Sequence, residues 1–299
     1  MPWLDRVLPD LNLYISGMFA MRRPDALQEC SITHVLSVIS LPLDDKLFEP
    51  YTRMVVDVDD MDDQNLIEHF PATNKFIKDA LDAGGGVLVH CAMGKSRSAT
   101  VVCAFLMHQY RLSAADALAR VREARAMCEP NEGFMQQLQL YHEMGQPNDV
   151  DASPPYQRWL YRREVESSRG LGQAPAADKI RFEDEHDPDP AGAAFELRCR
   201  KCRRILATSH FLTTHTPPAP PPSSQPPPLP RPCAHHFLEP LSWMRPELEQ
   251  GRLEGRIDCP KCRCLVGRYA WQGMACSCGR WVVPAISLAR GRVDAPGAR

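Results

Sequence analysis

The sequence lacks an excess of charge of either sign, and it lacks any long apolar run. Its 35 Lys and Arg residues almost balance 37 Asp and Glu residues, so the formal net charge is −2. This balance excludes a global polycation, and any contact with nucleic acid has to use a local basic patch. No apolar run approaches the length of a membrane span, and the first residues, MPWLDRVLPDLNLY, lack the apolar segment of a signal peptide. We therefore expect a soluble intracellular protein with no membrane partner.

Cysteine is scarce in most of the chain. Only four of the twelve cysteines precede residue 190, whereas the other eight fall between Cys199 and Cys278. Because no secretory signal is present, paired cysteines in this tail are better explained as metal ligands than as disulfides. The length of 299 residues suits about two domains, and the cysteines place the metal-binding candidates in the second.

The first half of the chain alternates between strand and helix patterns. Short apolar or β-branched runs that end at turn residues predict strands over 11–17, 33–40, 51–60 and 86–91. Apolar residues at helical spacing predict helices over 66–85, 98–110, 113–128 and 131–145. This alternation predicts an α/β domain over residues 1–146, with a central sheet covered by helices.

The remaining chain divides by composition. Residues 147–194 are polar and rich in turn formers, and they predict a linker in which only YQRWLYRREVE can hold a helix. A second domain over 195–294 is interrupted at 217–232, where ten of sixteen residues are proline. Such a tract cannot form a packed core, so we expect an exposed polyproline-type loop. A tolerated insertion is favoured over a docking motif for an SH3 or WW domain.

The stretch GVLVHCAMGKSRSAT contains two overlapping phosphate-binding patterns. A nucleotide-binding loop of the form G-x-x-x-x-G-K-[ST] needs a glycine at position 89, where the chain has Val89. The pattern His-Cys-x5-Arg-Ser, in contrast, is complete from His90 to Ser98. The loop is therefore interpreted as a phosphoester-hydrolysing loop around a cysteine nucleophile, and not as a nucleotide site.

Each position of this pattern has a chemical reason. A strand-to-helix turn and a nearby arginine lower the pKa of a thiol, which makes Cys91 the candidate nucleophile. Arg97 can give two parallel hydrogen bonds to phosphate oxygens, and Ser98 can hydrogen-bond the sulfur and improve it as a leaving group. His90 is expected to orient the loop backbone rather than transfer protons. The predicted phosphate-binding residues are Ala92, Met93, Gly94, Lys95, Ser96 and Arg97.

These residues carry a resemblance to a known family. Over roughly residues 1–146, HCAMGKSRSAT and PNEGFMQQL (130–138) resemble the dual-specificity phosphatases of the cysteine-dependent class. The resemblance implies hydrolysis of phosphotyrosine and phosphoserine or phosphothreonine through a phosphocysteine, without a metal, and a loop role for Asn131. It also implies a general acid about thirty residues before the nucleophile. Asp60 is chosen, just past the third predicted strand, with Asp59 as the alternative.

Lys95 bears on the choice of substrate. A lysine in this loop resembles phosphoinositide phosphatases of the same superfamily, whose loop lysines help to bind acidic head groups. Those enzymes typically carry a second basic residue just after the cysteine, where this chain has Ala92. A phosphoprotein substrate is therefore favoured over a phosphoinositide.

The tail has the spacing of zinc ligands. The pairs CRKC and CPKC each form a knuckle that presents two thiolates to one tetrahedral ion. With Cys233 and the CSC pair they supply seven thiolates, one ligand short of two four-coordinate sites. The candidates for the eighth ligand are His210, His215, His235, His236 and Cys264.

The order of these motifs resembles the Yvh-type dual-specificity phosphatases, in which a module binding two structural zinc ions follows the phosphatase domain. That resemblance favours His215 as the eighth ligand and leaves the pairing open. The implied ligands are Cys199, Cys202, His215, Cys233, Cys259, Cys262, Cys276 and Cys278. It also implies a role in large-subunit maturation, contact with the pre-60S ribosomal particle, and a location in nucleus and cytoplasm. The alternative is an assembly factor whose catalysis is dispensable.

Overall fold

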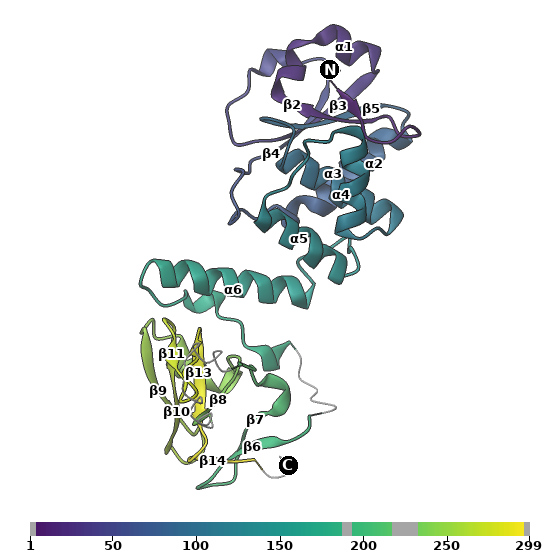
Figure 1. Cartoon of the computed structure of the whole chain (residues 1–299). Coiled ribbons are helices and arrows are strands. Elements are labelled where there is room, and N and C mark those ends of the chain that lie inside the picture. The colour runs from purple at the N-terminus through teal and green to yellow at the C-terminus, as the bar shows by residue number, and fades with distance from the viewer. Residues whose placement is uncertain (1–3, 187–192, 217–232, 296–299) are drawn as a thin grey trace, which may run out of the picture. The chain divides into compact units, whose positions relative to one another are not determined.

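The computed structural model of the chain describes residues 4–186, 193–216 and 233–295 (Figure 1). The chain divides into two compact units, Met1–Tyr156 and Gln157–Arg299. The proline-rich tract at 217–232, predicted to be an exposed loop, lies outside the described residues. Among the residues that are described, no helix combines the length and the apolar composition needed to cross a membrane.

The first unit is built on a five-stranded sheet in the order β1-β2-β5-β3-β4. The strands are β1 (Asp5–Arg6), β2 (Leu13–Gly17), β3 (Ile32–Val38), β4 (Thr52–Val56) and β5 (Gly86–Cys91). Strands β2 to β5 are parallel, and only the short β1 pairs antiparallel, with β2. The carboxyl ends of the four parallel strands therefore meet at one edge of the sheet, from which the candidate phosphate loop emerges.

Helices cover both faces of this sheet. They are α1 (Pro24–Glu29), α2 (Phe70–Asp82), α3 (Arg97–Tyr110), α4 (Ala114–Ala124) and α5 (Glu132–Glu143), with 3-10 turns η1 (Met18–Arg22), η2 (Asp45–Leu47) and η3 (Ile67–His69). Figure 1 shows α1 on one side of the sheet and α2 to α5 on the other. Every residue of α3 from Arg97 to Met107 is buried, because neighbouring helices and the sheet surround it. The predicted α/β fold with its covered central sheet is confirmed.

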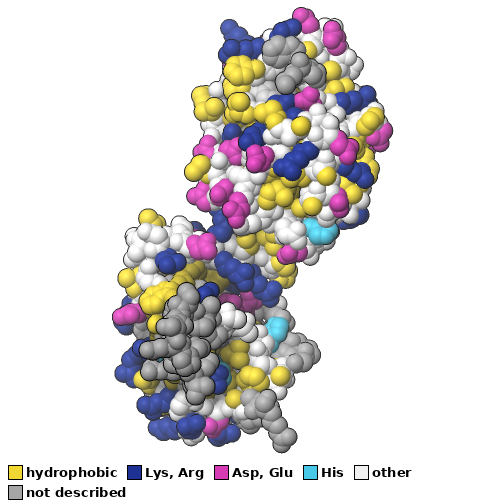
Figure 2. Space-filling model, viewed as in Figure 1, with side chains coloured by type: hydrophobic (Ala, Val, Ile, Leu, Met, Phe, Trp, Pro, Cys, Tyr) yellow, Lys and Arg dark blue, Asp and Glu magenta, His cyan; other side chains and the backbone are white. Residues whose placement is uncertain are grey.

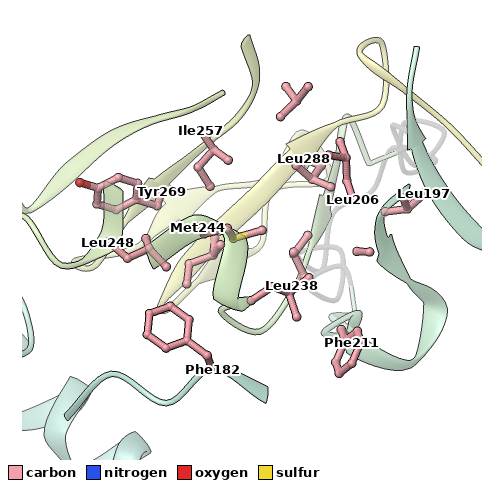
Figure 3. Close-up of a cluster of buried hydrophobic side chains, with 14 of the residues drawn as sticks. Phe182, Leu197, Leu206, Phe211, Leu238, Met244, Leu248, Ile257, Tyr269 and Leu288 are labelled. Atoms are coloured by element: carbon pink, nitrogen blue, oxygen red, sulfur yellow. The ribbon is translucent and has the colours of Figure 1, made fainter. Parts of the chain in front are cut away.

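The second unit consists of small antiparallel sheets. Its strands are β6 (Glu196–Cys199), β7 (Ile205–Thr208), β8 (His235–Phe237), β9 (Glu254–Asp258), β10 (Leu265–Ala270), β11 (Met274–Ala275), β12 (Trp281–Val282), β13 (Ala285–Ala289) and β14 (Val293–Asp294). They form sheets in the orders β8-β13-β10-β9, β14-β6-β7 and β11-β12. Its helices and 3-10 turns are α6 (Pro154–Gly170, which begins in the first unit), α7 (Arg245–Leu248), η4 (Ala177–Lys179), η5 (Glu183–Glu185), η6 (Ser209–Phe211) and η7 (Ser242–Met244). One apolar cluster joins Leu197 and Leu206 of the three-stranded sheet to Ile257 and Leu288 of the four-stranded sheet (Figure 3).

The segment 147–194 is not the polar linker that its composition predicts. The 17-residue helix α6 lies within it, and Tyr161 and Val165, one helical turn apart, are buried in the core of the second unit. Phe182 is 1 % exposed and lies close to Leu248 and Met244 in the same core (Figure 3). The polar composition concealed this role, because a helix needs only one apolar face to pack.

Candidate active site and metal-binding clusters

The candidate phosphate loop connects β5, the strand in the middle of the sheet, to the buried helix α3. Cys91 ends β5 and Arg97 begins α3, so the loop lies at the amino end of a helix dipole. Gly94 has a φ of +69°, and a Cβ there would collide with the backbone of Ser16 and Gly17. Only glycine fits this position, so the tight turn of the loop depends on it.

The loop keeps its amides turned inward because its carbonyls are bound from outside. Each carbonyl from Ala92 to Ser96 accepts a hydrogen bond from a group outside the loop. The donors, in order, are Met18 N (3.1 Å), Arg125 Nη2 (3.0 Å), Arg125 Nε (2.9 Å), Glu129 N (2.8 Å) and Thr100 N (2.8 Å). Arg125 is itself held by Asp5 at 2.6 Å. Since a peptide N–H points away from its C=O, this arrangement leaves the loop amides free for an anion.

Cys91 is buried and surrounded by hydrogen-bond donors. Its Sγ accepts from Gly94 N at 3.2 Å and from Ser98 Oγ at 3.3 Å. Burial by itself raises the pKa of the Cys91 thiol, but the Ser98 hydroxyl and the backbone amides of Ser98, Lys95 and Gly94 outweigh burial and leave the pKa below its ordinary value. The geometry therefore favours the thiolate, which is the nucleophilic form.

Arg97 has a donor available for a ligand. The side chain is 7 % exposed, and Nη1 donates to Val58 O at 2.9 Å. Its Nε is buried without a hydrogen-bond partner and lies 3.8 Å from Asp60 Oδ2. A buried unpaired donor is costly unless a ligand satisfies it, and a phosphate oxygen is an acceptor of the right charge.

Asp60 faces the phosphate loop and Asp59 does not. Asp60 Oδ1 accepts from Ser96 Oγ at 2.5 Å and from Asn131 Nδ2 at 3.1 Å. Asp59 instead accepts a hydrogen bond from Ser40, on the loop after β3. Of the two acids that the sequence left open, Asp60 is therefore the one that the structure brings to Arg97 and the loop.

The motif PNEGFMQQL fixes the loop that carries Asp60. Asn131 binds Asp60, and a Cβ on Gly133 would collide with the backbone of Asp62. Gln137 Oε1 accepts from the backbone N–H groups of Leu66 and Ile67, at 2.8 and 2.9 Å, and its Nε2 donates to Gln64 O at 2.8 Å. Asn131, Gln137 and Gly133 thus position one loop against α5.

His90 lies beneath the loop and is fully buried. It shares a 2.8 Å hydrogen bond with Ser37 Oγ, and its other ring nitrogen lies 3.4 Å from Cys91 O. Burial lowers the pKa of His90 to about 4, so the ring stays neutral near pH 7. A neutral, enclosed imidazole suits the predicted role of orienting the loop.

The eight predicted metal ligands come together in two groups of four. Cys199, Cys202, Cys259 and Cys262 form one, and His215, Cys233, Cys276 and Cys278 form the other. In each group all ligand atoms lie within 4.8 Å of one another. The pairing, which the sequence left open, is therefore interleaved, since each group joins an early pair to a late pair.

The ligand geometry fits a tetrahedral zinc ion. Cys199 Sγ lies 3.7 Å from Cys262 Sγ, and Cys202 Sγ lies 3.6 Å from Cys259 Sγ. Zinc–sulfur bonds of about 2.3 Å at tetrahedral angles place two sulfurs ~3.8 Å apart. The Cys199 and Cys259 knuckles are built alike: Arg203 and Arg263 follow them with φ of 65° and 57°.

The other candidates for the eighth metal ligand lie outside the two groups of four. Among the residues that the structure describes, neither group includes Cys264 or the histidines His210, His235 and His236. Cys264 nevertheless lies close to the first group, with its Sγ 3.3 Å from Cys262 Sγ and 3.6 Å from Cys199 Sγ. It is a fifth thiol beside four mutually close ones.

Two residues of the loop environment were not identified from the sequence. Arg125 holds two loop carbonyls, and Glu129 binds Lys95 through both backbone and side chain. Both lie in the stretch between α4 and α5, more than 25 positions after the loop. In the sequence they are marked only by their position just before PNEGFMQQL, and this position alone does not predict a contact with the phosphate loop.

The chain is similar to known proteins over most of its length. Residues 13–144 match the family described as dual specificity phosphatase, catalytic domain. The chain is 38 % identical to the tyrosine-protein phosphatase yvh1 of Schizosaccharomyces pombe over 95 % of its length and 83 % of the relative. It is 33 % identical to human dual specificity protein phosphatase 12, over 95 % of its length and 86 % of the relative.

A solved structure is also similar to part of the chain. The Yvh1 phosphatase domain from Chaetomium thermophilum is 39 % identical and covers 49 % of this chain and 99 % of its own, with a TM-score of 0.46. The two relatives named above are similar over 95 % of the chain, so the similarity extends over both units. The chain therefore belongs to the Yvh1 family of dual specificity protein phosphatases, and it is a protein-tyrosine phosphatase of that class.

Proposed function

We propose that Cys91 is the nucleophile, Arg97 the phosphate-binding cation and Asp60 the general acid of this phosphatase. The observation that carries the assignment is that a thiol, a buried guanidinium Nε without a hydrogen-bond partner and a carboxylate from a second loop converge at the phosphate loop. Cys91 Sγ has two hydrogen-bond donors, and Asp60 Oδ2 lies 3.8 Å from Arg97 Nε.

In the first step the Cys91 thiolate attacks phosphorus in line, and the bond to the leaving oxygen breaks. The inward amides of Ala92 to Arg97 and the Arg97 guanidinium hold the equatorial oxygens. Asp60 Oδ1 already accepts two hydrogen bonds, so Oδ2 is the atom that carries the proton. Transfer of that proton neutralises the leaving alkoxide or phenoxide.

In the second step Asp60 takes a proton from water, which attacks the phosphocysteine. The sulfur–phosphorus bond breaks and Cys91 leaves as a thiolate. Ser98 Oγ, 3.3 Å from the sulfur, stabilises the negative charge that returns to it. The products are inorganic phosphate and the dephosphorylated residue of the substrate protein.

The two cysteine-rich groups hold two structural zinc ions in this proposal. The ligands of one are Cys199, Cys202, Cys259 and Cys262, and those of the other are His215, Cys233, Cys276 and Cys278. Bound zinc supplies a cross-link between distant strands and takes no part in the hydrolysis. The ligand sets are closed, with four protein donors each, as in structural sites.

In this proposal the second unit with its two zinc ions, here called the zinc unit, acts in maturation of the large ribosomal subunit. The protein then contacts the pre-60S particle and works in nucleus and cytoplasm. Residues 195–299 contain more than twice as many Lys and Arg as Asp and Glu residues. Figure 2 shows Lys and Arg side chains along the left and lower edge of this unit. Such a local basic surface supports contact with RNA phosphates, in a chain whose net charge is only −2.

A growth test separates the two parts of the function. Cells that depend on this protein receive the Cys91→Ser variant or a chain ending at residue 194. If Cys91→Ser supports large-subunit maturation and the shortened chain does not, the zinc unit is required and catalysis is dispensable. The opposite result removes the ribosomal role of the zinc unit, whereas failure of both assigns that role to the complete enzyme. Hydrolysis of an aryl phosphate that vanadate inhibits and Cys91→Ser abolishes tests the chemistry directly.

A further inference from the structure

Lys95 and Glu129 make two contacts, one between their side chains and one between their backbones. Lys95 Nζ lies 2.7 Å from Glu129 Oε2, and Glu129 N donates to Lys95 O at 2.8 Å. The two side chains are 48 % and 64 % exposed. The hydrogen bond from Lys95 and its positive charge hold the pKa of Glu129 below its ordinary value, so this carboxylate is negatively charged at neutral pH.

The pair lines a pocket beside the phosphate loop. The pocket has a volume of about 590 Å³, and its walls come from the loop, from the end of α4 and from the stretch between α4 and α5. Its lining residues are Lys95, Arg122, Ala126, Met127, Cys128 and Glu129. Arg122 donates to Cys128 O at 2.8 Å, and Cys128 Sγ lies 3.7 Å from Gly94 O. The pocket therefore adjoins the phosphate loop at Gly94 and Lys95.

We propose that Glu129 determines the substrate class by neutralising Lys95 and by placing its own negative charge beside the phosphate loop. Substrates with a single phosphate on a protein side chain are accepted. Substrates with further phosphates next to the scissile one, such as a multiply phosphorylated inositol head group, are disfavoured. The inference rests on the proposed function, because it assumes that the loop holds the scissile phosphate.

The pocket holds one further cation, Arg122, whose Nε donates to Cys128 O at 2.8 Å. Met93 in the loop and Met61 after Asp60 are 62 % and 60 % exposed, and both are apolar. With Glu129 replaced by glutamine, Lys95 becomes an unpaired cation that can reach a second anionic group. One unit charge at ~7 Å, at an effective dielectric constant of about 40, changes the affinity for a further phosphate by roughly fivefold to tenfold.

The experiment compares two substrates in the full-length enzyme. They are a phosphotyrosyl peptide with neutral flanking residues and a soluble short-chain phosphatidylinositol 3,4,5-trisphosphate. For Glu129→Gln we expect the ratio of lipid to peptide kcat/KM to rise about fivefold, and the gain to shrink in high salt. Glu132→Gln, which removes the next exposed acid along the chain, is the matched control and leaves the ratio unchanged.

A double variant tests whether the effect of Glu129 on the substrate ratio depends on Lys95. Adding Lys95→Met to Glu129→Gln is expected to return the ratio to within about twofold of the wild-type value, because the freed cation is gone. An unchanged ratio in Glu129→Gln, a rise equal to that of Glu132→Gln, or a gain that survives in the double variant overturns the inference. A wild-type enzyme that hydrolyses neither substrate refutes the proposed function instead, so the two failures are distinguishable.

Discussion

Asn131 Nδ2 donates a hydrogen bond of 3.1 Å to Asp60 Oδ1, although the two residues are 71 positions apart. The other end of the same side chain, Oδ1, accepts from Phe134 N at 2.8 Å and caps α5. One amide thus fixes both the start of a helix and the position of the candidate acid. Folding of α5 and placement of Asp60 are coupled through it.

Replacing Asn131 is expected to cost both stability and activity. Asn131→Ala removes the α5 cap, worth about 1 kcal/mol of unfolding free energy, and releases Asp60, which lowers kcat about tenfold. Ser113→Ala is the matched control, because Ser113 caps α4 through Asp116 N at 3.1 Å without contacting the site. Denaturant unfolding and kcat are measured for both. Equal kcat losses in the two variants would show that only stability matters.

The role of Asp60 is tested by varying the leaving group. Asp60→Asn is expected to lower kcat by roughly 10²- to 10⁴-fold for alkyl phosphates, whose leaving oxygen needs a proton. The loss is smaller for an activated aryl phosphate, because its leaving oxygen is stable without a proton. Asp59→Asn, which alters the neighbouring carboxylate that binds Ser40, keeps kcat within about threefold in this scheme. A larger loss in Asp59→Asn would reassign the acid.

The pH dependence reports the hydrogen bond between Ser98 and Cys91. That bond lowers the pKa of the Cys91 thiol, so the thiolate forms as the pH rises through a value below the ordinary one. Ser98→Ala is expected to raise the pKa and to shift the ascending limb of kcat/KM toward higher pH. The alkylation rate of Cys91 by iodoacetamide, followed against pH, shifts in the same direction. A profile that stays in place contradicts the assignment.

Metal analysis tests the two proposed zinc sites of the second unit. We expect about two zinc ions per chain, and chelation is expected to unfold the second unit, since structural zinc supplies folding free energy. Cys199→Ser lowers the zinc content, whereas Cys264→Ser keeps two ions, because Cys264 lies outside the group of four. One ion or none in the wild-type protein would remove the two-site assignment. A loss of zinc in Cys264→Ser would make that thiol a ligand.

Sequence patterns were sufficient to predict those parts of the site whose residues follow one another in the chain. The strand ending at Cys91, the turn at Gly94 and the helix beginning at Arg97 follow one another, so composition and spacing predicted them together. The two-residue strand β1 and the six-residue helix α1 are too short to produce a periodic signal, and neither was predicted. A helix was considered possible at YQRWLYRREVE, which lies within α6, but polar neighbours diluted its apolar face, so its packing in a core was not predicted.

Contacts between distant segments could not be predicted in the same way. The spacing within CRKC and CPKC predicted that each pair binds metal, but nothing in the spacing joins Cys199 to Cys262 rather than to Cys278. Likewise, Glu129 has no local feature that distinguishes it from other exposed acids. Its importance follows from the fold, which places its backbone N–H against Lys95 O.

The interleaved order of the metal ligands has a consequence for biosynthesis. Cys199 and Cys262, which share a group, are 63 positions apart, and His215 and Cys233 of the other group lie between them. A nascent chain therefore holds neither complete set until Cys262 has left the ribosome exit tunnel, and it completes the second only with Cys278. The cysteine-rich unit consequently completes its two ligand sets only after most of its synthesis has ended.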